Sequence, residues 1–164
     1  ITVTRNTGKL TSKGIELEMS ATPVKGLQVD YNVGYTDAVY KKLKLAQSGS
    51  AVDLDGKKQI FTPDATSMLA VQYSYDLGTK QNIKIVARGE WFYIGTQYFN
   101  LANTIKQSGY NLFNIRTGFS TRSAELMFWG RNLGNKKYIA YAYDFGAIHL
   151  GDPQTVGVTL STRF

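Results

Sequence analysis

Few residues in this sequence have the types and spacing that catalysis requires. Glu16 and Glu18 stand two positions apart, so on one face of a strand their Cβ atoms would lie roughly 7 Å from each other. Paired carboxylates at such a distance can act as acid and base in glycoside hydrolysis. A strand that faces a water-filled interior carries the same pattern. We favour this second interpretation, in which both side chains are solvated.

Metal-binding and nucleophilic groups are equally scarce. Residues 53–56 (DLDG) resemble the start of a calcium loop, but the glutamate that ends an EF-hand loop is missing downstream, which favours a polar loop tip. His149 is the only histidine and there is no cysteine, which excludes disulfides, thiolate metal sites and thiol nucleophiles. A catalytic triad also needs a placed acid and nucleophile. We therefore predict no enzyme, no catalytic residue, no metal and no cofactor.

The composition is that of one folded, basic domain. The 164 residues carry a formal net charge of +7, with 43% hydrophobic and 13% aromatic residues, which excludes intrinsic disorder. The densest basic run is residues 41–44 (KKLK), and the remaining Lys and Arg are spread along the chain, which argues against a nucleic-acid partner. A positive surface can concentrate anionic ligands, contact lipopolysaccharide phosphates or simply solvate a loop, and these alternatives stay open.

The elements that must position these residues are indicated by alternation with a period of two, which is typical of strands with one apolar face. Ile15, Leu17 and Met19, for example, alternate with Glu16 and Glu18. No segment shows a sustained helical period, so the predicted fold is all-β and antiparallel. With the fragment 1–6, eight strands are predicted, the others being residues 15–22, 27–36, 69–77, 83–93, 113–120, 125–131 and 156–164.

Long and short connections alternate between these strands. The short turns are residues 23–26, 78–81 and 121–123, and the long connections are residues 41–63, 99–109 and 133–153. Strict alternation places every long loop at one rim of an up-and-down sheet, as in outer-membrane barrels. In a soluble sandwich, loop lengths would scatter between the two ends. Counting back from the C-terminus, all short turns share the rim that holds that end.

A lipid environment explains this pattern. Lipid offers no hydrogen-bond partners, so a spanning sheet must close into a barrel, with one face apolar and the other polar. No apolar run reaches the 18 or more residues that a spanning helix needs, whereas the strands have the length of about ten residues that a tilted spanning strand needs. On the polar, lumen-facing side we expect a salt-bridged inner wall. Its predicted residues are Glu16, Glu18, Arg88, Glu90, Arg116, Glu125, Arg131 and Arg163.

Several motifs resemble those of TonB-dependent outer-membrane receptors. Residues 12–18 (SKGIELE) are similar to the family's "GxE" strand start, and residues 61–63 (FTP) to its proline lead-in before a strand. Residues 130–138 (GRNLGNKKY) resemble its "NLF-D-K-x-Y" element, with Gly134 in place of the aromatic residue. The last strand, with Val158, Leu160 and the terminal Phe164, is similar to the signal that the barrel-assembly machinery reads. The resemblance spans the whole chain.

The resemblance implies that residues 1–164 are the C-terminal portion of a plugged barrel of about 22 strands, without the plug, in the bacterial outer membrane. It further implies energy-coupled uptake of a nutrient, most often a ferric siderophore, through a TonB complex that contacts the missing N-terminal part. Outer-membrane lipid and lipopolysaccharide are the other expected partners.

Tyrosines cluster in the last long loop, close to His149. Rigid aromatic surface with hydrogen-bonding tips suits a receptor mouth, so the candidate ligand contacts are Tyr98, Tyr138, Tyr141, Tyr143 and His149. Alternatively, Tyr141 and Tyr143 extend a strand and belong to an aromatic girdle at the membrane boundary. Two further alternatives concern the whole protein: a complete eight-stranded outer-membrane barrel with a structural or adhesive role, and a soluble β-barrel binding module.

Overall fold

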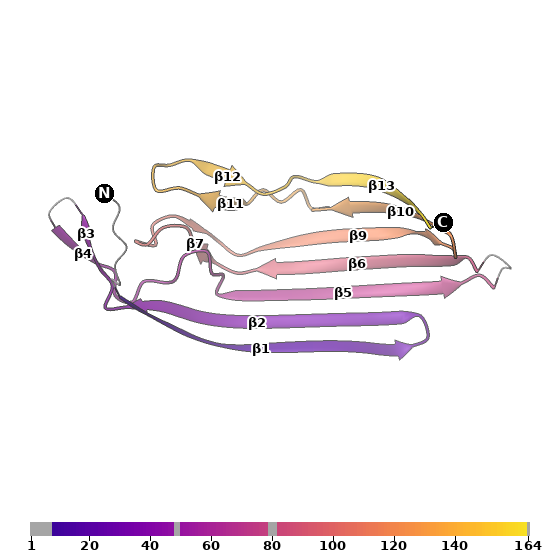
Figure 1. Ribbon diagram of the computed structural model, residues 1–164, viewed down its shortest axis with the longest axis horizontal. Coiled ribbons are helices and arrows are strands. Elements are labelled where there is room, and N and C mark those ends of the chain that lie inside the picture. The colour runs from indigo at the N-terminus through magenta and orange to yellow at the C-terminus, as the bar shows by residue number, and fades with distance from the viewer. Residues whose placement is uncertain (1–7, 48–49, 79–81, 164) are drawn as a thin grey trace.

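One antiparallel sheet of seven strands dominates the protein (Figure 1). The computed structural model describes residues 8–47, 50–78 and 82–163, and none of these residues belongs to a helix long and apolar enough to cross a membrane. The strands are adjacent in the order in which they occur along the chain, so the sheet is up-and-down. They are β1 (Lys9–Val24), β2 (Leu27–Lys41), β5 (Ala65–Asp76), β6 (Lys84–Ile94), β9 (Tyr110–Ser120), β10 (Ala124–Arg131) and β13 (Thr155–Thr162).

Each of these strands contains or overlaps one that the sequence predicted, but β1 and β2 are longer than predicted. Their pairing continues without a register shift from Ile15 opposite Tyr35 out to Lys9 opposite Lys41. The apolar alternation ends before this extension, so periodicity missed it. The predicted strand at residues 1–6 lies outside the described residues, and the other seven predicted strands all occur in the main sheet.

The three long connections each contain a small hairpin, and all three lie at one end of the sheet (Figure 1). The turns β1–β2 and β9–β10 and the end of the described chain lie at the opposite end. This confirms the predicted separation of long loops from short turns. The hairpins are β3 (Lys44–Gln47) with β4 (Ser50–Asp53), β7 (Gln97–Tyr98) with β8 (Lys106–Gln107), and β11 (Ile139–Ala142) with β12 (Ile148–Leu150).

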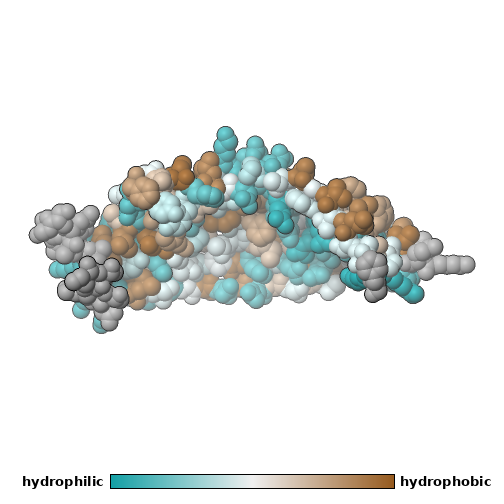
Figure 2. Space-filling model, turned by 45° about the horizontal axis from the view of Figure 1, so that its top comes forward, coloured by the Kyte–Doolittle hydropathy of each residue, from teal (hydrophilic) through white to brown (hydrophobic). Residues whose placement is uncertain are grey.

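The sheet has one apolar face that no second layer of the described chain covers. Its side chains are in register across the strands: Leu69 pairs with Tyr31 on one side and with Trp91 on the other, and Trp91 pairs with Phe113. Ile15 is 75% exposed, and apolar side chains are visible at the surface in Figure 2. A surface this apolar requires an apolar environment. The apolar rows therefore do not form a dry interior, as the prediction of a lipid-facing side requires.

The sheet does not close on itself within the described residues. β1 and β13 stand at its two ends, and each has a single hydrogen-bonded neighbour there. A sheet that spans a membrane must close, because an open edge leaves backbone groups unpaired in lipid. The structure therefore corresponds to part of a larger barrel, and neither the complete small barrel nor the soluble barrel is favoured.

Two glycines allow close contacts between neighbouring strands. A Cβ at Gly118 would lie 2.9 Å from the Cα of Met127 on the adjacent strand. At Gly157, which pairs with Trp129, the indole ring lies directly over the glycine, and a Cβ there would lie 2.7 Å from ring atom Cε2. Aromatic side chains that cover a glycine across a strand pair help to fix register.

Asn132 joins the end of β10 to the segment that leads into β13. It is 5% exposed, and its Nδ2 donates hydrogen bonds to the carbonyl oxygens of Lys136 (3.0 Å) and Asp152 (2.9 Å). Its Oδ1 accepts from the Lys136 backbone N–H at 2.8 Å. Its φ of 48° is one that asparagine tolerates better than most residues. The asparagine of the "NLF"-like motif thus has a structural role.

We predict that G118A destabilises the protein, because the added methyl group collides with the backbone of β10, which cannot move without breaking its pairing. The expected loss is about 1–3 kcal/mol. The control is G89A, since a Cβ at Gly89 meets no atom within 4 Å. Thermal unfolding in detergent measures both, and equal midpoints for the two variants would contradict the register.

We predict that N132A loosens the loop between β10 and β13, because the carbonyl groups of Lys136 and Asp152 lose the donor that the buried Asn132 supplies, at about 1–3 kcal/mol. Asn135 is a matched control, since it also has a positive φ, of 44°, but is exposed and accepts only a 3.3 Å bond from the Gln154 backbone. Limited proteolysis within residues 133–153 should be faster in N132A than in N135A. Similar cleavage rates would refute the role of Asn132.

Candidate functional site

Two of the long loops are held together side by side at the outer end of the sheet. The Lys58 backbone N–H donates to Asn103 Oδ1 at 2.6 Å, and Asn103 Nδ2 donates back to the Lys58 carbonyl oxygen at 3.0 Å. The Phe61 N–H donates to the carbonyl oxygen of Tyr98 at 2.8 Å. These bonds fix the segment before β5 against the segment after β7.

Five rings from these loops and from the β11–β12 hairpin form a continuous series, the aromatic ladder. Adjacent ring centroids are 5.8, 5.0, 4.5 and 5.0 Å apart. The ladder begins at a ring that is 4% exposed and ends at one that is 79% exposed. In order, its members are Phe99, Phe61, Tyr141, Tyr143 and Phe145.

Phe61, the second ring of the ladder, has a strained backbone. Its φ is 56°, a conformation that bulky residues seldom adopt and that costs of the order of 1–3 kcal/mol. The ring nevertheless lies between Phe99 and Tyr141, with 42% of the residue exposed. Such strain persists only where surrounding contacts over-determine a conformation, so the ladder has a defined geometry.

The predicted ligand residues lie in three different environments. Tyr141 and Tyr143 belong to the ladder, and His149 pairs with Tyr141 between β12 and β11. Tyr138 instead stacks on Tyr110, with centroids 4.4 Å apart, and is half-buried. Since Tyr141 lies on β11, the proposal that it extends a strand and the proposal that it offers ring surface are compatible.

The fifth predicted residue, Tyr98, lines a separate pocket, the rim pocket, with a volume of about 260 Å³. Lys58 and Lys106 also line it, together with the single carboxylate of Asp64. Lys58 Nζ donates a 2.6 Å bond to Asp37, and this bond raises the pKa of Lys58 above its ordinary value. Because the Lys58 ammonium group is paired with Asp37, Lys106 is the lining residue whose positive charge can attract an anionic group.

Sequence reasoning did not include Phe61 and Phe99 among the ligand candidates. Phe61 belongs to the FTP motif, which predicts a strand start and no ligand contact, and Phe99 follows Tyr98 without any periodic pattern. Local aromatic density at residues 98–99 was the one available signal. Contact between these rings and Tyr141 depends on how three loops fold together.

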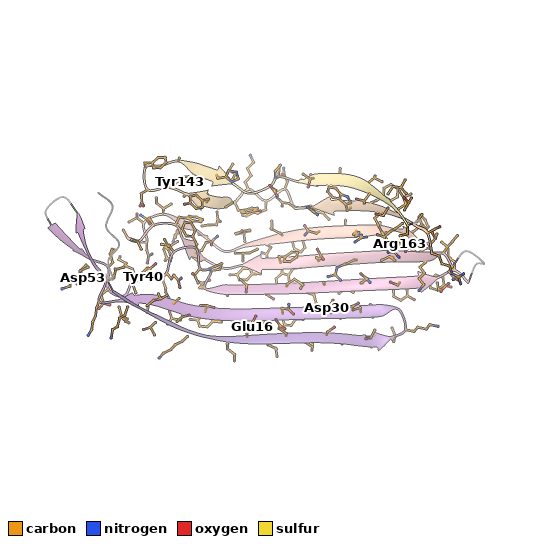
Figure 3. The ribbon with its side chains drawn as sticks, in the orientation of Figure 1. Glu16, Asp30, Tyr40, Asp53, Tyr143 and Arg163 are labelled. Atoms are coloured by element: carbon orange, nitrogen blue, oxygen red, sulfur yellow. The ribbon has the colours of Figure 1, made fainter. Side chains whose placement is uncertain are left out.

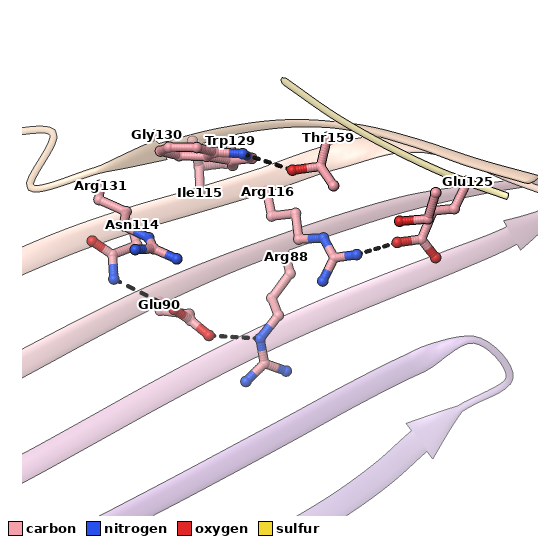
Figure 4. Close-up of a pocket in the computed structure, with 11 residues that line it drawn as sticks. Arg88, Glu90, Asn114, Ile115, Arg116, Glu125, Trp129, Gly130, Arg131 and Thr159 are labelled. Atoms are coloured by element: carbon pink, nitrogen blue, oxygen red, sulfur yellow. Dashed lines mark hydrogen bonds and ion pairs between the residues drawn. The ribbon is translucent and has the colours of Figure 1, made fainter. Parts of the chain in front are cut away.

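The predicted inner-wall residues share the sheet face opposite the apolar rows. Arg88, Glu90, Arg116, Glu125 and Arg131 line a pocket of about 320 Å³ on that face (Figure 4). Glu16 and Glu18 lie on the same face of β1, where both are exposed. Arg163 lines a smaller pocket beside Glu125. Figure 3 shows Glu16 and Arg163 well apart on the sheet.

Ion pairs connect four of the predicted wall residues, whereas Glu16, Glu18, Arg131 and Arg163 form no ion pair within the described part of the chain. Arg88 Nε donates to Glu90 Oε1 at 2.8 Å and a second Arg88 nitrogen lies 3.7 Å from Asp30. Arg116 pairs with Glu125, and the Arg131 guanidinium lies 5.1 Å from the centre of the Trp129 ring. Glu90 and Glu125 are thus engaged by arginines, and Glu16 and Glu18 are exposed, as expected of side chains that face water.

The possible calcium loop forms a local turn. The Asp55 N–H donates to Asp53 Oδ1 at 3.0 Å, and Asp55 Oδ1 accepts from the Lys42 N–H at 3.1 Å. Among the residues that the structure describes, no three His, Asp or Glu side chains converge on a metal position. The two aspartates therefore cap backbone groups at a loop tip.

Comparison with known proteins shows which family has this sequence pattern and fold. A family model described as "TonB dependent receptor-like, beta-barrel" matches residues 1–133. A ferrioxamine receptor of Yersinia enterocolitica is 29% identical over 96% of this chain and 21% of its own length.

Two solved structures have the same fold. The ferric yersiniabactin uptake receptor of Yersinia pestis matches with a TM-score of 0.80 at 21% identity, over 94% of this chain and 24% of that one. A siderophore receptor of Acinetobacter baumannii matches with a TM-score of 0.77 at 19% identity, over 93% of this chain and 22% of that one.

The chain thus spans about a fifth of the curated receptor that it resembles (21%), and its open sheet corresponds to one sector of a barrel wall. The family model covers residues 1–133, most of the chain, and the fold, the apolar outer face and the separated loops all agree with it. The chain belongs to the TonB-dependent receptor β-barrel family of the bacterial outer membrane.

Proposed function

We propose that the protein to which this chain belongs takes up a ferric siderophore across the outer membrane, using energy delivered by a TonB complex. The observation that carries the proposal is the match of residues 1–133 to the receptor barrel family. The names of its relatives, a ferrioxamine receptor and a ferric yersiniabactin uptake receptor, support a siderophore as the ligand class. These relatives are receptors, and we assign no catalytic step and no resident metal or cofactor to this chain.

The outer loops would supply the ligand contacts. The exposed end of the aromatic ladder, with Tyr141 and Tyr143, offers rigid ring surface, and His149 lies beside it in the same hairpin. Tyr98 and Lys106 in the rim pocket offer a polar and a cationic group. Ring surface and positive charge together suit an organic chelate with anionic groups. Tyr138 would act indirectly, by stacking on Tyr110.

The remaining predicted roles follow from the two faces. The ion-paired wall around Arg88 and Arg116 would face the lumen and contact a plug in the complete receptor. Val158 and Leu160 are exposed on the edge strand β13, where they would be accessible to the barrel-assembly machinery; Phe164, the third predicted residue of this signal, lies outside the described residues. The apolar face would contact outer-membrane lipid.

We predict that Y141A weakens ligand binding without unfolding the barrel, because it interrupts the ladder between Phe61 and Tyr143. Losing one aromatic contact, about 0.5–1.5 kcal/mol, corresponds to a roughly two- to tenfold higher Kd. The measurement is uptake of iron-labelled ferrioxamine and ferric yersiniabactin by cells that have this receptor as their single siderophore transporter, with surface expression quantified.

Y75A is the matched control, because Tyr75 lies near the end of β5 opposite the long loops and is similarly exposed. Y141F should retain most uptake, since the ring stays. Unchanged uptake in Y141A would remove the ladder from the ligand site. If expression of the unaltered receptor transports neither these nor any other ferric siderophore, the proposed function is wrong.

A further inference from the structure

Four lysines gather on the apolar side of the sheet at its long-loop end, and we call them the basic rim patch: Lys9, Lys13, Lys41 and Lys58. In the β1–β2 register Lys9 is opposite Lys41 and Lys13 is opposite Asp37. Lys58 forms a bridge with Val39, which is two residues from Lys41 on the same strand. Because side chains alternate along strands and opposed residues share a face, all four lie on the face that carries Ile15 and Tyr35.

The patch has more positive charge than the described chain neutralises. Lys58 forms a 2.6 Å ion pair with Asp37, and Lys13 and Lys41 act electrostatically on the same carboxylate. Lys9, Lys13 and Lys41 are exposed, and within the described residues none of the three forms a salt bridge. Because Asp64 also acts electrostatically on Lys58, two carboxylates face four ammonium groups.

Like charges directly opposite each other on neighbouring strands are destabilising. Lys9 and Lys41 have this arrangement, so the protein gains stability when an anion lies between them. The adjacent lysines of the KKLK run do not share the patch: Lys42 has a φ of 56° after β2 ends, and Lys44 pairs with Asp53 in the β3–β4 hairpin. The strand register therefore selects which lysines cooperate.

The position of the patch indicates which kind of anion can reach it. Lys13 is two residues before Ile15 in the outward-facing row of β1, roughly 7 Å closer to the long-loop end, so the patch begins where the apolar band ends. In bacterial outer-membrane barrels the long loops are extracellular, which places the patch beside the headgroups of the outer leaflet. Lysine stems can lie along the apolar surface while their ammonium groups reach the headgroup level.

We propose that the basic rim patch binds the phosphate groups of lipopolysaccharide in the outer leaflet. The patch lies on the outer wall and does not line the rim pocket except through Lys58, so the lipid would not occupy the ligand site. The inference rests on the membrane placement of the barrel and gives the expected lipid partner a defined site.

The test uses the complete receptor in nanodiscs, with and without lipopolysaccharide whose lipid A carries both phosphates. Lipopolysaccharide should raise the thermal unfolding midpoint of the unaltered receptor, because a ligand that binds only the folded state stabilises it. The variant K9Q/K13Q/K41Q should lose more than half of that increase. Without lipopolysaccharide it should be at least as stable as the parent, because the Lys9–Lys41 repulsion is gone.

The control K25Q/K136Q/K137Q removes the same charge from exposed lysines elsewhere and should keep the full increase. Dephosphorylated lipopolysaccharide should stabilise neither protein. An equal increase in the patch variant and the parent, or an equal effect of phosphatidylglycerol or inorganic phosphate, would overturn the proposal. Siderophore uptake by the patch variant should be unchanged, so a failure of uptake in the parent would contradict the proposed function and leave the lipid result intact.

Discussion

Lipid offers the backbone no hydrogen-bond partner, and this constraint governs the whole structure. Each of the seven strands finds its partners in its neighbours along the chain, with pairing maintained over eleven residue pairs between β5 and β6 and between β6 and β9. The same constraint leaves the two outermost strands, β1 and β13, in need of neighbours that the described part of the chain does not supply. A sector of a larger barrel is the arrangement that meets this need.

At the long-loop end, where strand pairing ends, side chains supply the hydrogen-bond partners of the backbone N–H and C=O groups. Asparagine does this repeatedly: Asn100 Oδ1 accepts from the N–H groups of Thr104 and Ile105, Asn103 bonds Lys58 in both directions, and Asn132 ties two segments together. Asn103 and Asn132 have positive φ values, which asparagine tolerates. The loops that carry the aromatic ladder are therefore ordered by specific polar contacts and not by a large core.

Much of the fold was predictable from the sequence. Alternation in segments such as residues 27–36 gave strand positions and their two faces, and loop lengths gave the separation of the rims. Alternation also placed Arg88, Glu90, Arg116 and Glu125 together on one face, where they do line a common pocket. It missed the outer extensions of β1 and β2, because the outward-facing row there contains Lys9, Lys13, Asp37 and Lys41 and the apolar period is lost.

The sequence by itself determined which side chains face lipid, because a period of two is a local property that each strand carries alone. Tertiary structure decided which residues meet. Phe61, Phe99 and Tyr141 come from three separate loops, and Lys9, Lys41 and Lys58 come together through the pairing of β1 with β2 and of β2 with the following loop. Such contacts depend on register and on loop closure between residues distant along the chain, and neither leaves a pattern within a single segment.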